Sequence, residues 1–149
     1  MADLKIITTE EITLDGEKKN SYFESTIPGV NNISERTISV PTGSNTTLFS
    51  FSNTEGAGTF LTGSLKYARI SNLTTDVPFN LEVSSSTGKL DFYVDGGSTF
   101  SFSSTEVSSS FSSSVSDSGS ISFFYDDISS IKINPQQTSS RLEYYIATN

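Results

Sequence analysis

Phenylalanine alternates with small hydroxyl residues between Ser98 and Tyr125, and this pattern limits the folds open to the chain more than any other. A serine or threonine precedes each of Phe100, Phe102, Phe111 and Phe123. Side chains along a β-strand point alternately to opposite faces, so a period of two indicates strands with one apolar face and one face in water. Serine and β-branched residues are also mediocre helix formers. The pattern therefore predicts an all-β protein.

Short apolar runs bounded by turn residues recur along the whole chain. Asp15-Gly16 has the composition of a tight hairpin turn, and Pro28-Gly29 predicts a connecting loop between Tyr22 and Ile33. The runs predicted as strands are Leu4 to Thr8, Ile12 to Leu14, Ile33 to Val40, Thr46 to Ser52, Phe60 to Leu73, Phe79 to Val83, Leu90 to Val94, Ile121 to Tyr125, Ile128 to Ile133 and Leu142 to Ala147. We therefore predict an antiparallel β-sandwich of roughly eight to ten short strands, with a jelly-roll or an immunoglobulin-like topology.

A chain of 149 residues is most economically one domain, so residues 1–149 are expected to form a single sandwich. Residues 1–20 are candidates for an N-terminal arm, and the serine-rich segment 103–120 is expected as a loop or an irregular hairpin. The alternation directs one set of large side chains to the shared interior: Phe49, Phe51, Phe79, Leu81, Phe92, Val94, Phe100, Phe102, Phe123, Leu142 and Tyr144.

The charge balance bears on the partners that this chain can bind. The formal net charge is −8 and the pI is about 4.3, so nucleic acid and anionic membranes would repel the protein. The first residues lack the apolar run of a signal peptide, and no run approaches the roughly 20 apolar residues needed to span a bilayer. We expect neither a nucleic acid nor a membrane as partner.

Side chains that usually carry chemistry are scarce in this sequence, which has no histidine and no cysteine. The segments Ser86 to Lys89 and Ser129 to Lys132 match S-x-x-K, but neither opens a predicted helix, as that chemistry requires. Asp126 and Asp127 are best explained as turn residues, and an enzyme that uses carboxylates alone stays an alternative. We predict no catalytic, cofactor-binding or metal-binding residue, and hence a protein that is not an enzyme.

Four tyrosines are candidates for surface contact: Tyr67, Tyr93, Tyr144 and Tyr145. A tyrosine exposed on a sheet face presents a flat ring with a polar end, which suits contact with a protein or a sugar. Packing within the sheets is the alternative explanation for each of them.

Segments at three places in the chain resemble small virion structural proteins of tailed bacteriophages, particularly phages of marine bacteria. The segments are LKYARISNL and FNLEV within residues 65–83, DISSIKI at 127–133 and LEYYIA at 142–147. The resemblance implies a β-sandwich without catalytic residues. It also implies a place in the virion, assembled in the host cytoplasm, with other virion proteins as partners (the major capsid protein or tail proteins), and a homo-oligomer.

The function that we expect from these observations is that of a non-enzymatic virion structural protein, a capsid decoration or cement protein that binds the capsid lattice. Two alternatives stay open. One is a tail or fibre accessory protein, and the other is a carbohydrate-binding or adhesin β-sandwich module that uses the surface tyrosines.

Overall fold

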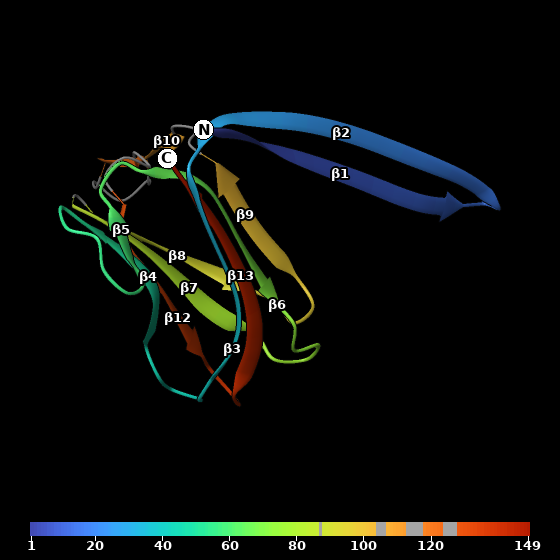
Figure 1. Ribbon diagram of the computed structural model, residues 1–149. Helices are drawn as coiled ribbons and strands as arrows, with labels where there is room; N and C mark the ends of the chain where they lie inside the picture. Colours follow the sequence, from blue (N-terminus) through green and yellow to red (C-terminus); the bar gives the residue numbers. More distant parts are fainter. Residues whose placement is uncertain (87, 104–106, 113–117, 124–127) are drawn as a thin grey trace.

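The structure, a computed structural model, consists of strands joined by turns and loops (Figure 1). It describes residues 1–86, 88–103, 107–112, 118–123 and 128–149, of which 107–112 and 118–123 are described by their backbone alone. In chain order the strands are β1 (Ala2–Leu14), β2 (Glu17–Val30), β3 (Asn32–Val40), β4 (Thr46–Ser52), β5 (Thr59–Leu61), β6 (Leu65–Asn72), β7 (Phe79–Ser85), β8 (Lys89–Val94), β9 (Thr99–Ser103), β10 (Val107–Ser112), β11 (Ser118–Phe123), β12 (Ile128–Pro135) and β13 (Ser140–Thr148). Within these ranges no residue is helical, so they contain no helix with the length and apolar character needed to cross a bilayer.

Two sheets, one of five strands and one of four, pack as a β-sandwich, which confirms the predicted fold class. Their strand orders are β5-β4-β12-β7-β8 and β3-β13-β6-β9. Apart from the short β5, which lies parallel to β4, the strands pair as nested hairpins: β3 with β13, β4 with β12, β6 with β9 and β7 with β8. Successive pairs of this nest alternate between the two sheets. This arrangement is the jelly roll, one of the two topologies left open by the sequence.

The two sheets face each other through apolar side chains. Along β7 and β12 nearly every second residue is buried, as expected for strands with one face inside. Ile70, Phe79, Leu81, Ile131 and Leu142 are fully buried in this interior. Burial of each side chain of this kind contributes about 1.5–3 kcal/mol to stability, so this core holds the sandwich together.

Most side chains predicted to face the interior do so. Those that are buried are Phe49, Phe51, Phe79, Leu81, Val94, Phe102, Leu142 and Tyr144. Phe92 and Phe100 are partly buried against the same core, with ring centroids 4.5 Å apart. The side chain of Phe123 lies outside the described residues.

A β-bulge in β4 turns a residue inward that alternation predicts on the opposite face. Phe49 pairs with Ile131 and Thr47 with Lys132, so Leu48 is an extra residue without a partner on β12. An extra residue of this kind bends the strand and shifts the alternation of its side chains. As a result, Leu48 and Phe49 are both buried.

The first two strands leave the sandwich as a long hairpin, here called the arm (Figure 1). β1 and β2 pair with each other along their length, and neither belongs to the two main sheets. Asp15 and Gly16 form the turn, with φ values of 52° and 81°. Positive φ at both positions is what a two-residue type I′ turn requires. The turn lies where the sequence predicts it.

The connecting loop predicted before Ile33 is wrong, because β2 continues to Val30. The Pro28-Gly29 pair forms a bulge and does not end the strand. The register of β1 with β2 shifts at this point, and Gly29 has a φ of 76°. Proline has no N–H to donate and glycine adopts positive φ without strain, so a bulge accommodates both. The arm spans Ala2 to Val30 and is longer than the expected 1–20.

The serine-rich segment, expected at 103–120 as a loop or an irregular hairpin, falls partly outside the described residues. Its described strands, β10 and β11, pair antiparallel as a separate two-stranded sheet. The carboxylate pair Asp126 and Asp127 also lies outside the described residues.

Candidate contact surfaces of the arm and the sandwich

The arm has two different faces. Leu4 lies opposite Ile27, Thr8 opposite Phe23, and Ile12 opposite Lys19, so these residues share one side of the ribbon. We call this side the apolar face of the arm; its residues are Leu4, Ile6, Thr8, Glu10, Ile12 and Leu14 of β1, and Glu17, Lys19, Ser21, Phe23, Ser25 and Ile27 of β2. Toward the tip this face is uncovered: Ile12, Leu14 and Phe23 are each more than half exposed.

On the opposite side, here called the charged face of the arm, the charged residues pair with one another. The residues of this face are Lys5, Ile7, Thr9, Glu11 and Thr13 of β1, and Lys18, Asn20, Tyr22, Glu24 and Thr26 of β2. Lys5 Nζ lies 2.8 Å from Glu24 Oε1, and Lys18 Nζ lies 2.9 Å from Glu11 Oε1. The Tyr22 hydroxyl donates to Glu24 Oε2 over 2.6 Å. The hydrogen bond from the Lys5 ammonium is the main reason why the pKa of the Glu24 carboxyl is lowered, and the bond from the Tyr22 hydroxyl lowers it further. The bond between Tyr22 and Glu24 also raises the pKa of Tyr22.

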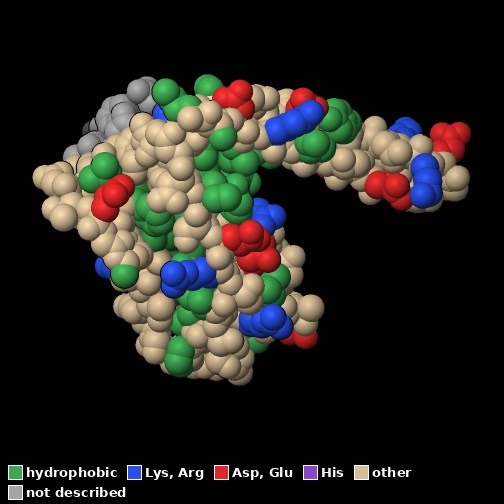
Figure 2. Space-filling model, viewed as in Figure 1, with side chains coloured by type: hydrophobic (Ala, Val, Ile, Leu, Met, Phe, Trp, Pro, Cys, Tyr) green, Lys and Arg blue, Asp and Glu red, His purple; other side chains and the backbone are tan. Residues whose placement is uncertain are grey.

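A hollow separates the base of the arm from the outer face of the four-stranded sheet (Figure 2). It has a volume of 640 Å³, and the arm contributes residues 4–8 to its wall. On the sandwich side, Tyr67 and Tyr145 stand next to each other with ring centroids 6.1 Å apart. Arg69, which pairs with Glu143, also lines the hollow. Two aromatic rings beside a guanidinium give this wall both apolar and polar contact groups.

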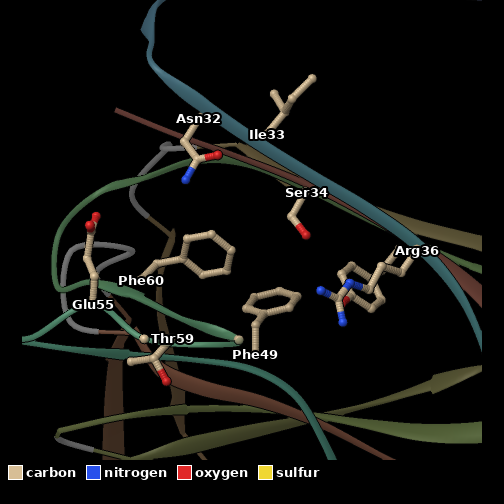
Figure 3. Close-up of a pocket in the computed structure, with 11 residues that line it drawn as sticks. Asn32, Ile33, Ser34, Arg36, Phe49, Glu55, Thr59 and Phe60 are labelled. Carbon is tan, nitrogen blue, oxygen red and sulfur yellow. The ribbon is translucent and has the colours of Figure 1, made fainter.

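A second cavity, here called the edge cleft, opens where the edge strand β3 passes the edge strand β5 (Figure 3). It has a volume of 270 Å³, and its wall includes the rings of Phe49, Phe60 and Tyr144. Phe49 lies 6.4 Å from Phe60 and 5.9 Å from Tyr144 between ring centroids. Arg36 and Glu55 stand on opposite sides of Phe49 and Phe60 in Figure 3. The cleft therefore combines aromatic rings with one charge of each sign at its rim.

The outer face of the five-stranded sheet is polar and forms many of its own contacts. Glu82 accepts from Lys89 over 3.1 Å and from Lys132 over 3.3 Å. Hydrogen bonding to Lys89 is the main reason why the pKa of Glu82 is lowered, and the same hydrogen bond raises the pKa of Lys89. Close by, Asn134 Nδ2 donates to Asn45 Oδ1 over 2.8 Å. Polar groups that already have partners gain little from a new ligand.

The four predicted contact tyrosines do not form one site. Tyr67 and Tyr145 lie together on the outer face of the four-stranded sheet, where both are half-buried and line the hollow. Tyr93 is 63% exposed and belongs to β8, in the other sheet. The expectation of surface contact is wrong for Tyr144, which is buried against Phe49 in the interior. The sequence analysis also predicts that Tyr144 faces the interior, and the structure confirms that prediction.

The sequence analysis did not identify the apolar face of the arm or the edge cleft. Ile12 and Leu14 are a visible signal in the sequence, but Phe23 falls in the segment predicted as a loop. Arg36 and Phe60 come from two strands that meet only through the fold, and no local pattern joins them.

Among the side chains that the structure describes, no three acidic, histidine or cysteine residues gather as a group that could hold a metal ion. In comparisons by sequence and by structure, the chain matches no family model, no curated protein and no solved structure.

Proposed function

We propose that this protein is a non-enzymatic structural subunit of a virion, a capsid decoration protein that binds the capsid lattice. One observation carries the proposal: the arm presents an uncovered apolar face while its charged face is internally paired. A face of this kind is stabilised when another surface covers it. A jelly roll that carries such an arm suits an assembly subunit; virus capsid proteins include jelly rolls, and here that likeness is a fold-level analogy.

The stability of the arm supports the same function. A two-stranded hairpin alone is marginally stable in water, and exposed ion pairs such as those of the arm add little to its stability. Covering a large apolar side chain such as Phe23, which is 63% exposed, contributes about 1.5–3 kcal/mol when burial is complete. Contact with a neighbouring subunit of the particle would therefore stabilise the arm and help to hold the protein in place.

The net charge of −8 is consistent with display on a particle. Like charges keep neighbouring copies from unspecific association, while many weak contacts to a repeating lattice add up to firm attachment. A decoration protein needs this combination of repulsion and avidity.

The test is a quantitative mass spectrometric measurement on purified virions whose genome encodes this chain. We expect the chain in a fixed ratio to the major capsid protein, and we expect tailless heads separated on a gradient to retain it. Absence of the chain from the particles would overturn the proposal. Recovery only in the tail fraction would replace it with the tail or fibre accessory function.

A carbohydrate-binding module is the second candidate, and the paired rings of Tyr67 and Tyr145 beside Arg69 favour it. A glycan array probed with the whole protein tests it. If a sugar binds in the hollow, Tyr145→Ala should abolish the signal, and Tyr93→Ala in the other sheet should leave it unchanged. An array without a signal would remove this candidate.

A further inference from the structure

The edge cleft has room for a large apolar side chain such as those exposed on the arm. Phe23 and Ile12 project from the arm without cover. In the edge cleft, the partly buried ring of Phe60 and, behind it, the buried ring of Phe49 border a space of 270 Å³ that is open to solvent. A large ring on one surface and a ring-lined cavity on the other are the elements of an interface anchor.

Their charges also complement each other. On the charged face, lysines and glutamates pair within the arm, but Glu10, Glu17 and Lys19 on the apolar face form no ion pair with any described residue. The same holds within the described part of the chain for Arg36 and Glu55 at the rim of the edge cleft. The apolar face of the arm thus carries one unpaired cation and two unpaired carboxylates, and the rim of the edge cleft carries one of each. Unpaired charges of opposite sign can pair across an interface.

The arm cannot fill the edge cleft of its own chain in this conformation. Figure 1 shows the arm running away from the side of the sandwich where β4 and β5 lie. The two complementary surfaces of one molecule therefore point to different neighbours. An arm from another copy would bring the missing partner to each cleft.

We propose that the apolar face of the arm of one copy docks in the edge cleft of a second copy of this chain. Phe23 enters beside Phe49 and Phe60, while Glu10 meets Arg36. Each copy both gives an arm and receives one, either reciprocally in a two-fold dimer or head to tail around a closed ring. The inference deepens the proposed virion function by naming a second copy as the partner of the arm, and it can stand without that function.

The first test measures the association of the whole protein by sedimentation. We expect wild-type chains to associate as concentration rises and Phe23→Thr to weaken that association roughly tenfold to a hundredfold. Tyr22→Thr is the matched control, because Tyr22 is 63% exposed like Phe23 but lies on the charged face of the same strand; it should associate like the wild type. A monomeric wild type, or equal weakening by both variants, would overturn the inference.

A charge exchange tests the role of the rim. Arg36→Glu should weaken association, and Glu10→Lys introduced into the same chain should restore it, since opposite charges would again meet across the interface. A double variant that associates no better than Arg36→Glu alone would overturn the pairing of Glu10 with Arg36.

Cross-linking locates the contact, and the natural chain has no cysteine to interfere. One chain carries Phe23→Cys and a differently tagged chain carries Ser34→Cys, a cleft-lining position (Figure 3). Mild oxidation of the mixture should give a disulfide-linked dimer containing both tags, whereas Tyr22→Cys in place of Phe23→Cys should give little. If virions contain the chain but no mixed dimer forms, the docking inference is overturned while the proposed virion function stands. A mixed dimer formed by a chain absent from virions would leave the inference standing and overturn the proposed function.

Discussion

Gly96 occupies a corner of the sandwich that has no room for a side chain. A Cβ at this position would lie 2.2 Å from the carbonyl oxygen of Thr75. Beside it, the amide of the buried Asn72 donates to the carbonyls of Val77 over 2.7 Å and of Asp95 over 3.2 Å. Close fit and hydrogen bonds therefore hold the β6–β7 and β8–β9 connections together.

We expect Gly96→Ala to lower the free energy of unfolding by about 1–3 kcal/mol, because backbone must shift to admit the new methyl group. Gly88→Ala is the matched control: nothing lies within 4 Å of a Cβ there, and its effect should stay within about 0.5 kcal/mol. Urea unfolding followed by circular dichroism measures both. Equal stability of the two variants would show that the corner can relax.

At the residue scale, the sequence predicts which side chains face inward but not which sites are sterically closed. The alternation of Phe79, Leu81 and Val83 leads directly to their burial. The turn at Asp95 to Gly97 is also visible in the sequence. The sequence does not show that position 96 must be a glycine, because the atom that a Cβ would meet there belongs to a different loop.

The arm is the element that the sequence predicts least well. Its turn and the apolar residues of β1 are visible, whereas the polar run from Lys18 to Ser21 and the Pro28-Gly29 pair resemble a loop. Pairing with β1 makes this segment a strand. A bulge then accommodates the residues that would otherwise end it.

The charged face of the arm should respond to pH through Glu24. Lys5 lowers the pKa of this carboxyl in the folded arm, so the ion pair stabilises the arm above the unfolded-state pKa of glutamate and is lost as pH falls through the lowered folded value. Tyr22, whose pKa is raised by its bond to Glu24, keeps its contribution below the unfolded-state pKa of tyrosine and loses it as pH rises through the folded value.

An NMR titration of the Glu24 carboxyl measures this effect. The midpoint in the wild type should lie below the ordinary value for glutamate, and Lys5→Gln should move it upward. Lys18→Gln, which removes the other ion pair of the arm, should leave the Glu24 midpoint in place. Identical midpoints in wild type and Lys5→Gln would contradict the assignment of Lys5 as the main cause.

On the scale of the whole molecule, the sequence predicts a sandwich but cannot choose its topology. The choice depends on pairings between distant segments, such as β3 with β13 and β4 with β12. Short strands with alternating patterns look alike in a jelly roll and in an immunoglobulin-like fold. Only the paired register distinguishes them.

The sandwich should fold without most of the arm. β1 and β2 pair with each other and lie outside the two main sheets, so deleting residues 2–28 should shift the thermal unfolding midpoint by no more than a few degrees, about what 1 kcal/mol produces in a domain of this size. The deletion keeps Val30, which is buried. A fall of the midpoint well beyond this, measured by calorimetry, would show that the arm supports the core of its own chain.

An electron cryomicroscopy map of the purified virion tests the central claim most directly, namely that this molecule is an assembly subunit whose arm is covered by a neighbour. The expected map contains the jelly roll at regular positions on the capsid surface, with the apolar face around Phe23 buried against an adjoining subunit. A capsid without density for this chain, or a bound subunit whose arm extends freely into solvent, would contradict the claim.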